Sequence, residues 1–370
     1  MIIPELVWPI ALGLVTLIQL CYYLFLFSRF IFYKKPLKKA SQQYPVSVVI
    51  CARDEAKNLA KNLPGVLVQD YPTTHEIIVV NDNSTDESKY VLEGFQQHFK
   101  NLTVVPLTQE AKHIPGKKFP LSIGIKSAKN EVLLLTDADC IPASEHWIEK
   151  MQDAYLQSTD VVLGYGAYNK KPGLLNKIIR FETFHTALQY FSYALAGMPY
   201  MGVGRNLSYR RELFVRNKGF SAINQIPSGD DDLFINKVAK KDNVAIVFDK
   251  DTHTLSEPPK TWSDWFAQKS RHYTTAKFYK PLHRNLLSLY AFAQTFIYPL
   301  TIAAAIFYNW QIALVIFLLR FIVQAVIWNI GMKKLNEADL FPYFVLFDIW
   351  LFIYNIIFFP TLFRKPKKRW

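Results

Sequence analysis

Two aspartates separated by one residue, Asp137 and Asp139, are the side chains of this chain best suited to chemistry. They directly follow residues 132–135, an apolar run typical of a buried strand. Open α/β sheets bind their ligands at the carboxyl ends of their strands. Carboxylates also suit Mg²⁺ or Mn²⁺, which bridge such oxygens to the phosphates of a substrate. The pair therefore predicts a divalent-cation site, although an acidic turn before a helix has the same short pattern.

The segments around this pair alternate between strand-like and helix-like patterns. Short runs rich in branched apolar residues occur in the segments 46–52, 76–82, 101–107 and 132–139, and we expect Ser84 to cap the helix after the second. Strands that alternate with helices of about 10–15 residues indicate βαβ units and a parallel sheet. The chain has neither a G-x-G-x-x-G nor a Walker A sequence, so two common phosphate loops are excluded.

Five motifs in this soluble region resemble those of family 2 glycosyltransferases: VSVVICARDE, IIVVNDNSTDES, LLLTDAD, SGDDDLF and QKSRH. The resemblance covers residues 44–275 and is greatest to the membrane-anchored branch with ceramide glucosyltransferase and the cellulose, hyaluronan and poly-N-acetylglucosamine synthases. It implies the α/β fold called GT-A, a mostly parallel sheet flanked by helices. It also implies inverting transfer of a sugar from a nucleotide-activated donor.

The resemblance gives five residues a role toward the donor. Asp82 matches the aspartate that accepts a hydrogen bond from the nucleobase, usually uracil, and Glu55 would lie near the ribose. Asp139 would bind the cation, while Asp137 would hold the ribose or support the cation. Lys117 would neutralise the diphosphate as a point charge, although the residues after it depart from the family pattern and a solvated basic loop remains the alternative.

The motif SGDDDLF implies the catalytic base. Relatives carry two adjacent acids before a helix, and the second of them is the base; here Asp230 and Asp231 match them. Asp231 would take the proton of the acceptor hydroxyl. A third acid, Asp232, leaves the register open by one residue, and crowding of carboxylates is expected to raise at least one pKa.

The motif QKSRH and the residues after Gly204 imply the acceptor side of the site. Arg271 would pair with the diphosphate, and Gln268 would hydrogen-bond near the acceptor. His272 stands where relatives carry a tryptophan that stacks on the acceptor sugar, and this departure disfavours a polymerising role. Arg205 and Asn206 match positions that shape the acceptor pocket in relatives.

The N-terminal residues 1–33 predict an uncleaved membrane anchor. Residues 6–33 are long enough to cross about 30 Å of hydrocarbon and carry no charge before Arg29. Basic residues follow the span rather than precede it, which argues against a signal peptide. The positive-inside rule then places the catalytic region in the cytosol, with the flank formed by Arg29, Lys34, Lys35, Lys38 and Lys39.

Residues 284–370 predict a second membrane region. Residues 286–308 and 311–332 each reach membrane length and are separated by a turn at Asn309 and Trp310. A last apolar stretch, 341–363, contains Asp348 and Asn355 and precedes the basic tail RKPKKRW. A full span would put that tail outside, against the positive-inside rule, so a re-entrant or in-plane element is preferred over a fourth span.

The net charge and the cysteine content further limit the partners and the compartment that this protein can have. The net charge of +13 comes largely from Lys and Arg beside the apolar segments, which suits anionic lipid rather than nucleic acid. Three scattered cysteines predict neither a disulfide framework nor a zinc site, as expected in a reducing cytosol. Residues 173–204 predict a helix that is either part of the core or lies on the membrane surface, with Glu182 and His185 as packed polar residues.

Together these patterns predict an integral protein of a bacterial cell membrane that moves a sugar from a UDP-sugar, with Mg²⁺ or Mn²⁺, to a hydroxyl of a lipid or lipid-linked saccharide. The main alternative is a processive polysaccharide synthase, which would need a transmembrane channel. A non-catalytic scaffold would have lost carboxylates that this chain keeps. A transporter would need polar residues distributed over many spans.

Overall fold

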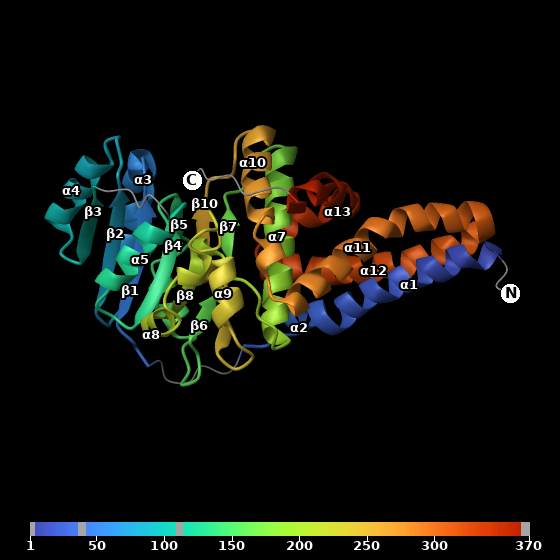
Figure 1. Cartoon of the computed structure of the whole chain (residues 1–370), viewed down its shortest axis with the longest axis horizontal. Helices are drawn as coiled ribbons and strands as arrows, with labels where there is room; N and C mark the ends of the chain where they lie inside the picture. Colours follow the sequence, from blue (N-terminus) through green and yellow to red (C-terminus); the bar gives the residue numbers. More distant parts are fainter. Residues whose placement is uncertain (1–3, 36–41, 109–113, 364–370) are drawn as a thin grey trace.

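The computed structural model describes residues 4–35, 42–108 and 114–363. Lys38, Lys39 and the basic tail lie outside the described residues. Figure 1 shows an α/β domain at one end and three long helices that project from it at the other. The described N-terminal end lies at the far tip of these helices.

A seven-stranded sheet of order β3-β2-β1-β4-β8-β6-β9 forms the centre of the α/β domain. The first four strands in the chain are parallel, and β8 is antiparallel to both of its neighbours. The predicted mostly parallel sheet is therefore confirmed. Its strands are β1 Val46–Ala52, β2 His75–Asp82, β3 Leu102–Leu107, β4 Val132–Asp137, β6 Val161–Leu163, β8 Leu207–Arg210 and β9 Val244–Ile246.

Successive side chains of each strand point to opposite faces of the sheet, and the apolar ones form two cores, one on each face. Val48 and Ile50 of β1 pack with α3 (Ala56–Leu67) and α6 (Trp147–Gln152), while Val49 packs with α5 (Lys118–Ser127). The sheet domain also carries the shorter helices α4 Ser88–His98, α8 Arg211–Arg216 and α9 Asp232–Val238. Because both faces are covered, ligands can reach the sheet only at its strand ends.

The register of the sheet brings two loops together at one edge. The parallel pairing of β1 with β4 places Cys51 opposite Asp137, so the loops that follow these strands are neighbours. The loop after β1 is also tied to the loop after β2, since the Asp54 amide donates to Ser84 Oγ (3.0 Å). The predicted cap at Ser84 is wrong: α4 begins at Ser88, and the Ser84 hydroxyl stabilises the Asp54 loop instead.

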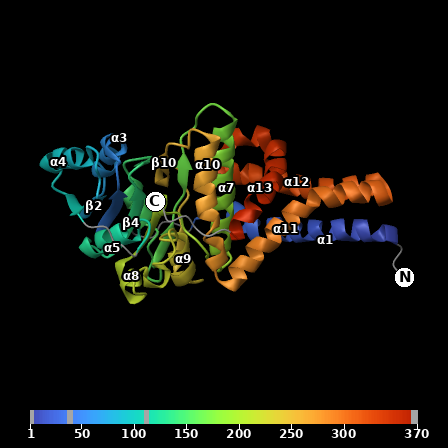
Figure 2. The same cartoon turned by 45° about the horizontal axis from the view of Figure 1, so that its top comes forward.

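A second layer separates the sheet from the long helices. A three-stranded sheet, made of β5 Cys140–Pro142, β10 Thr254–Ser256 and β7 Gly166–Tyr168, lies beside α7 Leu174–Leu195 and α10 Trp262–Tyr273 (Figure 1). Most side chains of α7 are buried, which matches the core-helix alternative. In Figures 1 and 2, α7 and α10 run across the direction of the three long helices.

Three helical stretches in the described part of the chain are long and apolar enough to cross a membrane: Val7–Ile31, Pro281–Lys334 and Ala338–Thr361. The first contains α1 Val7–Cys21 and α2 Ser28–Ile31. The second is the predicted hairpin, formed by α11 Pro281–Ala304 and α12 Trp310–Lys334. Asn309 caps α12 by accepting hydrogen bonds from the amides of Gln311 and Ile312, which explains why the turn falls there.

The third stretch, with α13 Phe344–Phe358, takes another direction. α13 lies against α7 and α11 and runs across the hairpin in both views (Figures 1 and 2). Asp348 of α13 forms a two-pronged ion pair with Arg320 of α12, with both N–O distances 2.7 Å and both side chains fully buried. Gln294 and Gln324 donate to the same carboxylate. This network fixes α13 across the direction of the α11–α12 hairpin.

Candidate active site

A cavity of about 830 Å³ opens at the strand ends of the sheet and continues to the long helices. At one end it is lined by the loops after β1 and β4, with Glu55, Asp137 and Asp139. Its middle is lined by the start of α9 and by α10, and its far end by α7, α11 and α13. The cavity thus connects the predicted donor residues with the apolar helices.

Lys117 organises the acidic end of the cavity. This residue precedes α5, and its ammonium lies 2.7 Å from Asp137 Oδ1 and 3.3 Å from Asp230 Oδ2. Burial opposes the ammonium charge, but Asp137 and the neighbouring carboxylates outweigh it and raise the pKa of Lys117 well above its usual value. Burial likewise opposes ionisation of Asp137, yet Lys117 holds the pKa of that carboxyl below its usual range. Both groups are therefore charged at neutral pH.

Asp139 is only partly compensated, by the charges of Arg205 and Lys117 and by a hydrogen bond from Cys140 Sγ. Burial and then the negative charge of Asp137 raise the pKa of Asp139. Within the described ranges, no group of three or more His, Cys, Asp or Glu residues is arranged to hold a metal ion. Two carboxylates, one with a charge that is only partly compensated, nevertheless fit Mg²⁺ or Mn²⁺, since Mg²⁺ typically keeps several waters and takes one or two carboxylates plus substrate phosphates. Such an ion would offset the charge that burial penalises.

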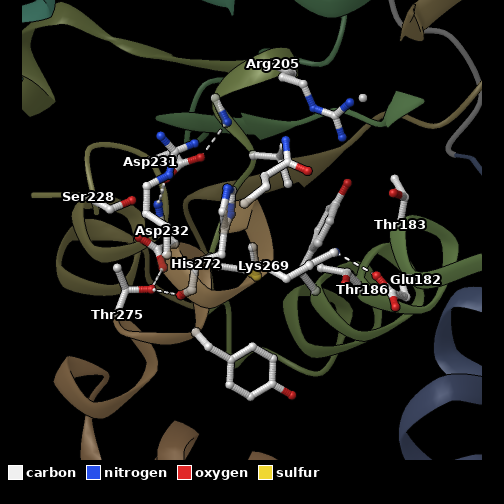
Figure 3. A pocket seen from close by; sticks show the side chains of 18 of the residues that line it. Glu182, Thr183, Thr186, Arg205, Ser228, Asp231, Asp232, Lys269, His272 and Thr275 are labelled. Atoms are coloured by element: carbon white, nitrogen blue, oxygen red, sulfur yellow. Dashed lines mark hydrogen bonds and ion pairs between the residues drawn. The ribbon is translucent and has the colours of Figure 1, made fainter. Parts of the chain in front are cut away.

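Asp231 lines the cavity at the start of α9, and in Figure 3 it lies on the side opposite Glu182 and Thr183. Its carboxylate accepts hydrogen bonds from the amides of Gly204 (2.8 Å) and Asp232 (2.7 Å), so its orientation is fixed by the backbone. Burial and the adjacent charges of Asp230 and Asp232 raise the pKa of Asp231 to about 7. A carboxylate with this pKa can accept a proton near neutrality.

Asp232, by contrast, is fully engaged by the protein. Its Oδ2 accepts hydrogen bonds from Thr275 Oγ1 (2.5 Å) and Tyr279 hydroxyl (2.8 Å), and its Oδ1 accepts from the Leu233 amide (2.7 Å). These bonds leave Asp231 as the better base, which supports the register that the sequence left open. Asp232 ties α9 to the segment after α10.

Helix α10 brings the QKSRH residues to the cavity. Gln268, Arg271 and His272 all line it, and Gln268 Nε2 donates to the Tyr168 hydroxyl at 3.3 Å. The Arg271 side chain has no ion-pair partner within the part of the chain that the structure describes. Its cation is thus free for an anionic ligand.

Arg205 also reaches the cavity. Its guanidinium stacks over the Tyr168 ring, 4.2 Å from the centroid, and donates to Ser256 Oγ at 2.7 Å. These contacts hold the cation in one orientation along the cavity wall (Figure 3).

Two of the predicted site residues are not brought to the cavity wall. Asn206 is fully buried; it accepts from Trp147 Nε1 and donates to the carbonyls of Tyr165 and Thr252. Because all these bonds are internal, Asn206 holds the chain together rather than facing an acceptor. Asp82 is buried at the end of β2 behind Arg53, 3.9 Å from its guanidinium.

The structure adds a connection that sequence reasoning did not find. Glu182 of α7 accepts hydrogen bonds from Trp265 Nε1 of α10 and Trp350 Nε1 of α13, both at 3.0 Å, and pairs with Lys269 at 3.2 Å. An acidic residue within an aromatic helix was the only sign in the sequence that Glu182 has buried partners. Those partners, Trp265 and Trp350, lie 83 and 168 residues away in the chain. Glu182 thus joins α7 and α13, at the far end of the cavity, to α10 in its middle.

Two family models match the chain. Glycosyl transferase family 2 matches residues 47–216, and Glycosyl transferase family group 2 matches residues 133–359. The second match covers more than half of the chain and continues from the sheet domain through the apolar helices. Both matches include residues 133–137 of the strand that ends at Asp137.

The individual relatives have low sequence identity to this chain. The chain is 26% identical over 242 residues to the probable glycosyltransferase YdaM of Bacillus subtilis, which covers 61% of this chain and 54% of that protein. It is 28% identical over 101 residues to the beta-monoglucosyldiacylglycerol synthase of Nostoc, covering 27% and 21% of the two chains. The chain thus spans about half or less of the length of these curated relatives.

Among solved structures, the mannosyltransferase PcManGT of Pyrobaculum calidifontis, determined with GDP-Man and Mn²⁺, has a similar fold. The TM-score is 0.58 at 18% identity, and the similarity covers 93% of this chain and 98% of that chain. This likeness confirms the predicted GT-A architecture.

Proposed function

This chain belongs to glycosyl transferase family 2, and on that premise we propose that it moves one sugar from a UDP-sugar to a hydroxyl of a lipid or lipid-linked saccharide. The observation that carries the proposal is the shared cavity: Asp137 and Asp139 line it at one end, Asp231 lines its middle, and α11 and α13 line the other end. A donor at the strand ends and an acceptor from the membrane could therefore meet at Asp231.

The chemistry follows from the residues of the cavity. Asp231 takes the proton of the acceptor hydroxyl as its oxygen bonds to the anomeric carbon, and the bond from that carbon to the diphosphate breaks with inversion. Lys117 and Arg271 offer positive charge to the departing UDP. Asp139 and Asp137 would hold Mg²⁺ or Mn²⁺, which would supply Lewis-acid stabilisation of the same leaving group.

The arrangement of helices supports a membrane-bound enzyme. The stretches Val7–Ile31 and Pro281–Lys334 would span the bilayer, with α7, α10 and α13 lying along its cytosolic face. The Trp262 and Trp350 rings, 6.2 Å apart between α10 and α13, suit such an interface. The orientation with the catalytic domain in the cytosol rests on the positive charges after the first span.

A direct test is to incubate the purified full chain in lipid nanodiscs with a panel of UDP-sugars, GDP-mannose and a native lipid extract. Mass spectrometry of the lipid fraction then reports which sugar is added and to what. The proposal predicts addition of a single sugar from a UDP-sugar to a lipid. Addition of many sugars would favour a processive synthase, and no sugar transfer with any donor would refute the proposal.

A further inference from the structure

We propose, building on the proposed transfer reaction, that the far half of the cavity binds a neutral polyhydroxyl head group and selects against acceptors that carry a phosphate. We call this region the head-group chamber and define it by Thr183, Thr186 and Gln189 of α7, Ser288 of α11 and Asn355 of α13. The chamber would hold the acceptor next to Asp231 while its acyl chains stay in the bilayer.

The chamber is continuous with the catalytic end. In Figure 3, Asp231 and Asp232 lie on one side, His272 and Lys269 lie between, and Thr183, Thr186 and Glu182 lie on the other side. On α7 the lining positions 183, 186 and 189 are spaced by three residues, so they share one face of the helix. A head group between this face and Asp231 can therefore present a hydroxyl to the base.

The polar groups of the chamber suit hydroxyls. Within the described residues, the hydroxyls of Thr186 and Ser288 have no hydrogen-bond partner, although both line the cavity. Each can donate and accept, and the Gln189 and Asn355 amides add both kinds of group. Thr183 differs, because its hydroxyl donates to the Ile179 carbonyl at 2.8 Å. A polyol, in which every oxygen both donates and accepts, is the complementary ligand.

The charges of the chamber cancel. None of the five residues that define it is charged, and the charged residues beside it, Glu182 and Lys269, pair at 3.2 Å. Burial lowers the pKa of His185 to about 3, so this side chain is neutral as well. Within the chamber an acceptor phosphate would meet no unpaired cation, because Arg205 and Arg271 act on Asp137 at the donor end of the cavity. The chamber therefore favours an uncharged head group.

The surrounding helices suit the apolar part of such a lipid. Leu287 and Ala291 of α11 and Leu351 of α13 line the cavity beside the polar residues. The outer faces of the same helices expose large apolar side chains, as expected for contact with acyl chains: Leu289, Phe292, Phe296, Ile353 and Ile356. A glycosylated diacylglycerol fits both surfaces.

The test compares two acceptors with the same dioleoylglycerol tail in nanodiscs: a monohexosyl diacylglycerol, which is neutral, and phosphatidylglycerol, which has free hydroxyls and a phosphate. We expect at least tenfold higher kcat/KM for the neutral lipid. Equal or better use of phosphatidylglycerol would overturn the inference. Loss of transfer to both lipids and to the native extract would instead refute the proposed function, so the two failures are distinguishable.

Variants test whether the chamber itself makes the selection. Thr186→Val and Ser288→Ala each remove one hydroxyl and should raise KM for the neutral lipid about three- to tenfold, with kcat and the Kd of UDP unchanged. Thr301→Val on α11 is the matched control, because its hydroxyl donates to the Ile297 carbonyl and Thr301 does not line the cavity. Unchanged KM in both chamber variants would contradict the assignment.

Discussion

The ionisation of Asp231 should control the reaction at acid pH. Burial and the charges of Asp230 and Asp232 raise the pKa of Asp231 to about 7, and only the ionised form can accept a proton. One unit below this pKa about a tenth of the carboxyl is ionised, and one unit above it about nine tenths. We therefore expect kcat/KM to fall about tenfold from about pH 8 to about pH 6.

The assay is the initial rate of sugar transfer in nanodiscs across this pH range, at subsaturating acceptor. Asp232→Asn removes one of the charges that raise the pKa of Asp231 and should move the acid limb to lower pH. The Kd of UDP is measured calorimetrically at each pH, because the pKa of Asp139 is also raised. This control separates loss of the base from loss of donor binding.

An ordinary aspartate, with a pKa of about 3.9, would be almost fully ionised throughout this range and would give a flat profile. A flat rate between about pH 6 and about pH 8, with UDP binding unchanged, would refute Asp231 as the titrating base. An acid limb that stays at the same pH in the Asp232→Asn variant would refute the same assignment.

Three further changes test other parts of the structure. Asp348→Asn leaves the buried Arg320 cation without its ion-pair partner and should lower the free energy of unfolding by about 3–5 kcal/mol, measured in detergent micelles. The double variant Asp348→Leu, Arg320→Met removes both charges, and an equally large loss of stability in it would contradict the ion-pair explanation. Asp139→Ala should abolish the Mn²⁺-dependent part of UDP binding, and an unchanged Kd in the presence of Mn²⁺ would argue against its role. Asn206→Ala leaves buried groups unpaired and should cost about 1–3 kcal/mol of stability without changing acceptor KM; a higher KM at full stability would restore Asn206 to the acceptor site.

Local patterns predicted much of the fold. The runs that form β1 to β4 are branched and apolar because both faces of the sheet are covered, so their bounds could be read within one or two residues. The α11–α12 hairpin followed from span length and from a polar residue at its turn. Asp137 and Asp231 could be placed in one site because parallel strands end at the same edge and the family motifs supplied the second position.

Contacts between distant segments could not be predicted in this way. The bonds of Glu182 join α7, α10 and α13, and no local period of the chain encodes them. Ser84 has the residue type of a helix cap, but the Asp54 amide competes for its hydroxyl. Asn206 matches a position that shapes the acceptor pocket in relatives, yet its side chain points into the core. Three hydrogen bonds to other residues of the chain hold it there.

The measurement that most directly tests the central claim is transfer of labelled sugar from a UDP-sugar to lipid by the full chain in nanodiscs, compared between the native protein and Asp231→Asn. The asparagine keeps the shape of the side chain but cannot accept the proton at this pH. We predict loss of transfer by at least about 100-fold, with the Kd of UDP unchanged within about twofold. Native turnover in Asp231→Asn would contradict the claim that this cavity is a glycosyltransferase active site with Asp231 as its base.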